Sequence, residues 1–178
     1  MEMFRFALGA HPGDPCVPMK TRLFLATALA ALVTSGCGQK DTSQSAAAAP
    51  AGPREIDITA GDTMKYDVTQ IDAKPGEDLK VVLTNNGTQP ILVMGHNWVL
   101  LKAGSDVAAF DAAALNSKDT GYIPAALSDE IITHVDLLGP RKSGEADFKA
   151  PTTPGDYPFL CTFPAHYQAG MRGTLTVK

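Results

Sequence analysis

The stretch CTFPAHYQAGM, residues 161–171, lies close to the carboxyl end of this 178-residue chain. It places a thiol, an imidazole and a thioether at even intervals, on Cys161, His166 and Met171. All three side chains bind soft or borderline metal ions. Pro164 lies between the first two, restricts the backbone and removes one N–H donor. The stretch therefore predicts a metal-binding loop, and a further ligand has to come from elsewhere in the chain.

Short β-type segments bounded by turn residues precede and follow this loop from Arg54 onward. The segments predicted to be strands are 55–58, 79–83, 97–101, 130–138, 144–149, 157–161 and 173–178. An alanine-rich segment, 106–116, interrupts them and predicts a short helix. Seven or eight strands in a segment of this length indicate an all-β fold, an antiparallel Greek-key sandwich with the helix inserted on its flank.

A fourth candidate ligand is His96, which follows Gly95 at the start of a predicted strand in the sequence MGHNWVL. A strand that begins at the same end of the sandwich as the loop can bring His96 to Cys161 and His166. Two imidazoles, one thiolate and a weak axial methionine form the ligand set of blue-copper electron-transfer sites. Structural zinc sites favour closed sets of Cys and His without a thioether. Iron–sulfur clusters need about four cysteines.

Residues 54–178 resemble the cupredoxins of the azurin and auracyanin type, because GHNWVL, CTFPxH and the final GTLTVK are close to the azurin motifs. The resemblance implies a single copper ion in the plane of three ligands, His96, Cys161 and His166. It implies Met171 as an axial ligand, with the Gly95 carbonyl as a weak or absent second one.

The same resemblance implies two supporting features. Asn97 would brace the cysteine loop. An apolar patch around His166 would receive redox partners, with the members Met64, Met94, Phe163, Pro164 and Ala165. The alternative is that some of these side chains only fill the end of the sandwich.

Two features depart from the azurin pattern, and two other residues are explained by structure alone. Four residues separate His166 from Met171, as in auracyanins, whereas azurins have three. Asn85 stands where azurins carry a pH-responsive histidine, so this position predicts no strong dependence of the redox potential on pH. Trp98 is predicted to be a core residue, and His134 an ordinary strand histidine.

These features predict a monomeric one-electron carrier that cycles one copper ion between Cu(I) and Cu(II) among transient protein partners, and not an enzyme. Copper storage or delivery by the same site is the alternative. A nucleic-acid partner is not expected, since the formal charge is −4 and no Lys/Arg cluster offsets it. An oxidase or nitrite reductase needs additional copper centres, which a chain with four histidines cannot build.

The N-terminal part of the chain predicts targeting. Residues 19–36 have the basic start, apolar run and small-residue end of a secretory signal. The TSGC ending resembles a lipoprotein signal, so Cys37 is expected to carry a lipid that anchors an exported, periplasmic protein to the membrane. Simple secretion is the alternative. Residues 37–53 predict a flexible tether, and residues 1–18 an over-extended start before Met19.

Overall fold

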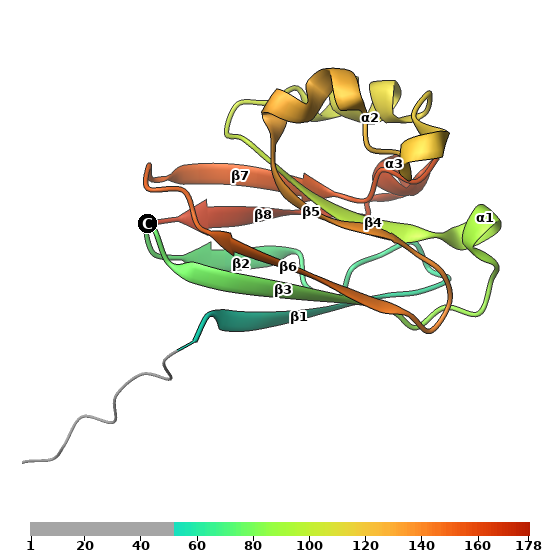
Figure 1. Ribbon diagram of the computed structural model, residues 1–178, viewed down its shortest axis with the longest axis horizontal. Helices are drawn as coiled ribbons and strands as arrows, with labels where there is room; N and C mark the ends of the chain where they lie inside the picture. Colours follow the sequence, from blue (N-terminus) through green and yellow to red (C-terminus); the bar gives the residue numbers. More distant parts are fainter. Residues whose placement is uncertain (1–51) are drawn as a thin grey trace, which may run out of the picture. The chain divides into compact units, whose positions relative to one another are not determined.

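The computed structural model describes residues 52–178 (Figure 1). The predicted over-extended start, signal peptide, lipid site at Cys37 and tether up to residue 51 lie outside the described residues. Within the described range, no helix has the length and apolar character needed to cross a membrane.

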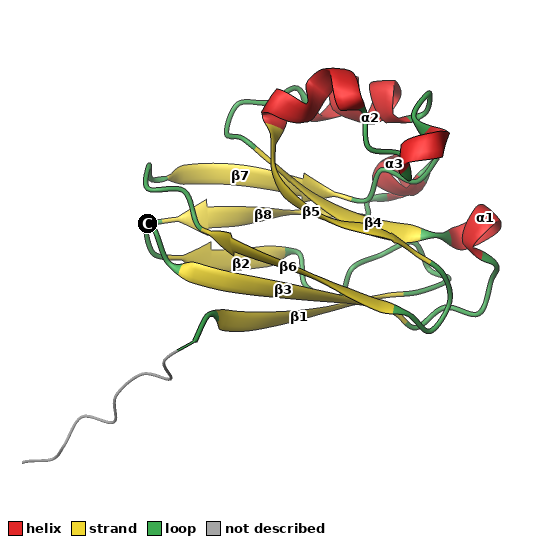
Figure 2. Cartoon of the chain, viewed as in Figure 1, coloured by secondary structure: helices red, strands yellow, loops and turns green. Residues whose placement is uncertain are grey.

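Two β-sheets pack face to face as a sandwich (Figure 2). One sheet has three strands, in the order β1 (Arg54–Ala60), β3 (Asp78–Asn85) and β6 (Ser143–Lys149). The other has five, in the order β2 (Gln70–Ala73), β8 (Arg172–Val177), β7 (Gly155–Leu160), β4 (His96–Leu101) and β5 (Ile131–Leu138). The predicted all-β sandwich of seven or eight strands is confirmed.

The strand directions differ from the antiparallel arrangement that the sequence predicts. β1 pairs in parallel with β3, and β2 pairs in parallel with β8. Hydrophobic periodicity reports which face of a strand is buried, but it carries no information about the direction of the neighbouring strand. The sequence does not predict β2, because its four residues, QIDA, give only two alternations of exposed and buried positions.

Alternation of buried and less buried side chains explains the middle strand of the smaller sheet. In β3, Leu79, Val81 and Leu83 are fully buried and the residues between them are not. β4 differs, because all six of its residues are buried. Its second face is covered by the inserted helix α2 (Val107–Ala114), through an apolar cluster that contains Phe110, Val99, Leu101 and Leu160.

The helix predicted over 106–116 is confirmed as α2, with shorter bounds. Asp106 caps its start, because the Asp106 carboxylate accepts a hydrogen bond from the Ala109 N–H at 3.0 Å. Trp98 is fully buried, as predicted for a core residue, and its ring centroid lies 5.4 Å from that of Phe159. His134 lies in β5 as predicted, 3.3 Å from the Asp136 carboxylate.

Short helical segments connect the strands. They are α1 (Ile91–Met94), α3 (His166–Ala169), and the 3-10 segments η1 (Lys118–Thr120) and η2 (Ala125–Glu130). α1 and α3 lie at the end of the sandwich where β4 begins and β7 ends (Figure 1). The sequence predicts neither, because a single helical turn is too short to show a 3.6-residue period.

Candidate metal centre

Two neighbouring strands and one connection bring three candidate ligands together. His96 opens β4, and Cys161 directly follows β7, which pairs with β4. Nδ1 of His166 lies 3.4 Å from Sγ of Cys161 and 3.2 Å from Nδ1 of His96. The three ligand atoms all lie within 4.8 Å of one another, and all three residues are buried. Donor atoms at this spacing can share one ion at bond lengths of about 2.0–2.3 Å.

Met171 is held beside this group by its backbone. Its N–H donates to the His166 carbonyl at 2.9 Å, and its carbonyl accepts from the Cys161 N–H at 3.0 Å. The side chain is fully buried. The structure therefore ties Met171 directly to two of the three convergent residues.

Gly95, the residue before His96, is required by packing. A Cβ atom at this position would lie 2.7 Å from the Ile91 carbonyl oxygen and 2.9 Å from a methyl carbon of Leu137. Glycine at this position therefore has a steric explanation that is independent of any metal.

Asn97 connects three segments through its buried side chain. Its Nδ2 group donates to Thr162 Oγ1 at 2.7 Å and to the Gly121 carbonyl at 3.1 Å. Its Oδ1 atom accepts from the Thr162 N–H at 2.9 Å. The Tyr66 hydroxyl donates to the Asn97 carbonyl at 2.5 Å. Since Thr162 directly follows Cys161, these bonds fix the backbone beside the thiol.

Burial dominates the electrostatics of the three convergent residues. It raises the pKa of the Cys161 thiol to about 12, although hydrogen bonding from the backbone of Asn97 and Phe163 opposes it. Burial, with a smaller effect of His96, lowers the pKa of His166 to about 4. Burial also lowers the pKa of His96, against the smaller effects of the Gly61 carbonyl and the Asp62 carboxylate. At neutral pH the metal-free site thus holds neutral imidazoles and a protonated thiol, and a bound cation would supply the charge that stabilises a thiolate.

Comparison with known proteins agrees with this donor set. The model of the copper-binding proteins of the plastocyanin/azurin family matches residues 54–178. The chain belongs to this family. Its cofactor is accordingly copper, the ion that two imidazoles, a thiolate and a thioether suit.

Individual cupredoxins of this family are similar over most of the described range. Auracyanin-B of Chloroflexus aurantiacus is 34% identical over 74% of this chain, and the match spans 59% of its own length. Azurin of Bordetella pertussis is 35% identical over 67% of this chain and 81% of its own.

Solved structures of auracyanins are also similar to this chain. Auracyanin from Roseiflexus castenholzii superposes with a TM-score of 0.63, at 37% identity, over 71% of this chain and 98% of that one. Auracyanin A of Chloroflexus aurantiacus, described as a "blue" copper protein, gives a TM-score of 0.63 at 32% identity, over 71% of this chain and all of that one.

The patch expected around His166 is only partly at the surface of this cupredoxin. Ala165 is exposed, whereas Met64, Met94 and Pro164 are half-buried. Phe163 is buried, so its placement at the surface was wrong. Its ring packs between those of His166 and Tyr122, with centroid distances of 4.8 Å and 5.2 Å. His166 itself is only 1% exposed and lies just beneath this end of the sandwich.

Exposed apolar residues beside the site were missed by the sequence reasoning. α1, which directly precedes Gly95 and His96, buries none of its residues. Ile91, Leu92 and Val93 are 37%, 74% and 58% exposed. The available signal was the run ILVM after Pro90, because four successive apolar residues in one helical turn cannot all face a core.

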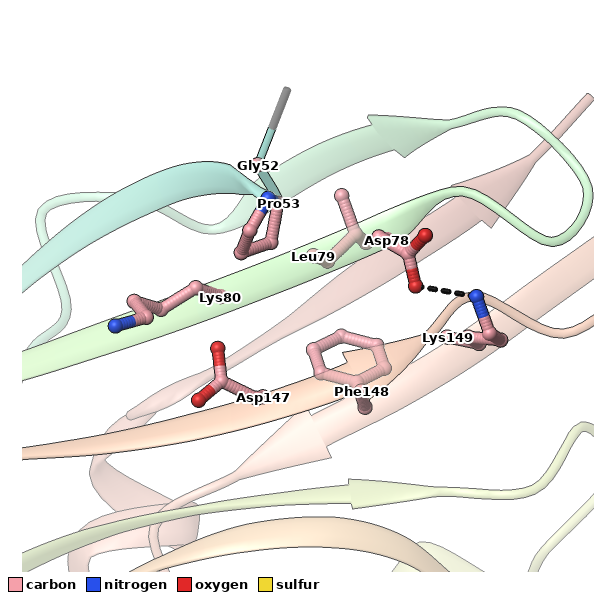
Figure 3. A pocket seen from close by; sticks show the side chains of 8 residues that line it. All are labelled: Gly52, Pro53, Asp78, Leu79, Lys80, Asp147, Phe148 and Lys149. Atoms are coloured by element: carbon pink, nitrogen blue, oxygen red, sulfur yellow. Dashed lines mark hydrogen bonds and ion pairs between the residues drawn. The ribbon is translucent and has the colours of Figure 1, made fainter. Parts of the chain in front are cut away.

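A surface hollow of about 870 Å³ lies at the start of β1 and along β3 and β6 (Figure 3), and no metal-site residue lines it. Its described lining consists of Gly52, Pro53, Asp78, Leu79, Lys80, Asp147, Phe148 and Lys149. An ion pair of 2.5 Å joins Lys149 and Asp78 there (Figure 3). None of these residues is a candidate ligand, and the hollow adds nothing to the metal chemistry.

Proposed function

We propose that this protein is a one-electron carrier with a type 1 copper site. His96, Cys161, His166 and Met171 would hold the ion, with the Gly95 carbonyl as at most a weak contact. The observation that carries the proposal is the convergence of the three donor atoms within 4.8 Å in a copper-binding family. When bound, copper would accept and release one electron, and the chain itself would turn over no substrate.

The protein's contribution is to hold the donors in one arrangement for both oxidation states. Asn97 fixes the backbone next to Cys161, and the backbone bonds of Met171 close the loop on His166 and Cys161. All four proposed ligands are buried, so water has little access to the ion. A rigid, dry site suits electron transfer, whereas copper storage or delivery needs an accessible site from which the ion can leave.

Reconstitution with Cu²⁺ tests this function directly. An intense blue colour that one-electron reductants bleach reversibly is expected, because a Cu(II)–thiolate bond gives this absorption. A colourless product, or copper that a mild chelator removes at once, would favour delivery instead.

Metal binding is expected to release one proton. At about pH 7–9 the histidines of the metal-free site are already neutral, since burial lowers the pKa of His96 and lowers that of His166 to about 4. The pKa of Cys161 is raised to about 12, so its thiol must lose a proton when it binds the ion. The affinity should therefore rise about tenfold per pH unit in this range.

Titration calorimetry with Zn²⁺, a redox-inert probe, in buffers of different ionisation enthalpy measures this proton count. A count near zero would mean that Cys161 is not a ligand or is already a thiolate.

Transient redox proteins would dock where the ligand loop reaches the surface, on exposed Ala165 and the half-buried Met64, Met94 and Pro164. The exposed apolar residues of α1 extend this face. A small apolar docking face fits partners that must separate quickly, whose interfaces bury less than about 1,200 Å².

We also propose export, with a lipid on Cys37, on the basis of the signal in residues 19–37. The carrier would work as a monomer.

Ala165→Asp is expected to slow electron self-exchange between oxidised and reduced protein by about ten- to a hundredfold, because a desolvated charge opposes docking. The blue spectrum should persist. Ala165 has a left-handed backbone with φ of 69°, which Asp and Asn tolerate better than Ala. Ala165→Asn, with the same shape and no charge, is the control. NMR line broadening measures the exchange, and equal rates in all three proteins would contradict docking at this face.

A further inference from the structure

A buried carboxyl group lies in the inserted helix α2. Asp111 is only 1% exposed. Its Oδ2 atom accepts a hydrogen bond from Nε2 of Gln168 at 2.5 Å, whereas its Oδ1 atom has no hydrogen-bond partner among the described residues. None of the ion pairs between described residues includes Asp111. A buried carboxylate without a cation is unfavourable.

The hydrogen-bond partner of Asp111 belongs to the ligand loop, residues 161–171, which carries Cys161, His166 and Met171. Gln168 lies in α3, two residues after His166 and three before Met171. Tyr167, its neighbour, packs against the apolar cluster of α2. On another side of the loop, Lys65 Nζ donates to the Ala169 carbonyl. The inserted helix therefore contacts the loop between two proposed ligands through one polar and one apolar contact.

We propose that Asp111 is a positioning residue of the metal centre, which holds the loop through Gln168 and whose carboxylate favours the oxidised, more positive state of the ion. The proposal rests on the copper function proposed above. Burial is the largest cause of the raised pKa of the Cys161 thiol, and the charge of Asp111 adds a smaller effect in the same direction.

None of the hydrogen bonds or ion pairs between described residues brings a cation to Asp111. The apolar residues that pack in the cluster with α2 from the neighbouring strands and connections are Val99, Leu101, Leu160, Ile123, Leu127 and Ile131. The titratable or charged groups of the loop are Cys161, His166 and Tyr167. Two cations lie against it: Lys65, whose Nζ donates to the Ala169 carbonyl, and Arg172 of β8, which stacks on the Tyr167 ring at 4.9 Å. Asp106, on the same helix, is engaged as its N-cap.

The charge balance couples the ion and the carboxyl group. Gain of one electron from a redox partner removes one positive charge from the site, so Asp111 then takes up a proton from solvent more readily. Burial raises the pKa of Asp111 above its ordinary value. The hydrogen bond from Gln168 lowers this pKa, but by less than burial raises it. The potential should therefore fall as pH rises through the titration of Asp111, although Asn85 gives no reason to expect a pH effect.

Asp111→Asn tests the proposal in the copper-loaded protein, because asparagine keeps the shape and can still accept from Gln168. The redox equilibrium should shift about tenfold toward the reduced protein, which raises the midpoint potential by about 59 mV for one electron. The dependence of the potential on pH should disappear. Asp57→Asn is the matched control, since Asp57 is an exposed residue of β1 and the substitution removes the same charge. It should shift the potential far less. Equal shifts of the potential in both variants would contradict the proposal that Asp111 favours the oxidised state.

The metal-free protein gives a second, independent readout. A carboxyl group with a raised pKa binds more protons folded than unfolded, so wild-type stability should fall as pH rises from the unfolded to the folded pKa. Asp111→Asn should remove this fall, and carbon NMR of the wild type should show Asp111 titrating above the ordinary pKa of an aspartate. Gln168→Leu should loosen α3, measured by faster amide exchange.

These readouts separate the two proposals. If the wild type binds no blue copper but the metal-free results hold, the copper function fails and the contact between Asp111 and the loop stands. If blue copper forms and the metal-free protein shows neither effect, the role of Asp111 fails alone.

Discussion

Cys161→Ser is expected to abolish the blue colour of the copper-loaded protein and to weaken metal binding by more than about a hundredfold, since loss of a ligand should exceed the 10–100-fold effect of losing a ligand's supporting partner. A serine hydroxyl stays protonated at neutral pH and cannot replace a thiolate as a soft, anionic donor. His96 and His166 would keep their places, but two neutral imidazoles alone bind the ion weakly.

The metal-free variant should still fold, because serine nearly matches the size of the buried Cys161. Absorption during a Cu²⁺ titration and competition with a chelator measure the two losses. Thr162→Ser is the control: it removes one methyl group from the adjacent buried residue, keeps the hydroxyl that accepts from Asn97, and changes no proposed ligand. A blue Cys161→Ser protein would disprove the thiolate assignment.

The sequence predicted the sandwich because its signals are local. Leu79, Val81 and Leu83 alternate with less buried residues, and such a period identifies a strand without knowledge of its neighbours. The candidate ligands were also predictable, since Cys161, His166 and Met171 lie within one short stretch. Only His96 required an assumption about space, and the structure places it beside His166 and Cys161.

Features that depend on distant contacts were not predictable. The parallel pairing of β1 with β3 depends on how the chain crosses between the sheets. Phe163 is buried because Tyr122, from a distant loop, packs on its ring. Asp111 looks like one more solvent-facing acid of an alanine-rich helix until the fold brings Gln168 to it.

Asn97→Ala is expected to lower the free energy of unfolding by about 2–4 kcal/mol, because buried polar groups that lose their partners are costly and this network has several. The substitution removes the acceptor of the Thr162 N–H and the donor to both Thr162 Oγ1 and the Gly121 carbonyl. Urea unfolding of the metal-free protein measures the loss. Asn86→Ala is the matched control, since Asn86 is exposed and directly follows β3. Equal stabilities of the two variants would contradict the network.

Comparison of metal-free and copper-loaded Asn97→Ala then separates two roles of the side chain. If Asn97 only stabilises the fold, the loss of unfolding free energy is the same with and without copper. If it also holds the segment after Cys161 in the geometry that the ion needs, the loaded protein loses more, by the amount that copper affinity falls. The hydrogen bond from the Thr162 N–H to Asn97 Oδ1 favours the second outcome, because it fixes the peptide unit that carries the proposed thiolate ligand.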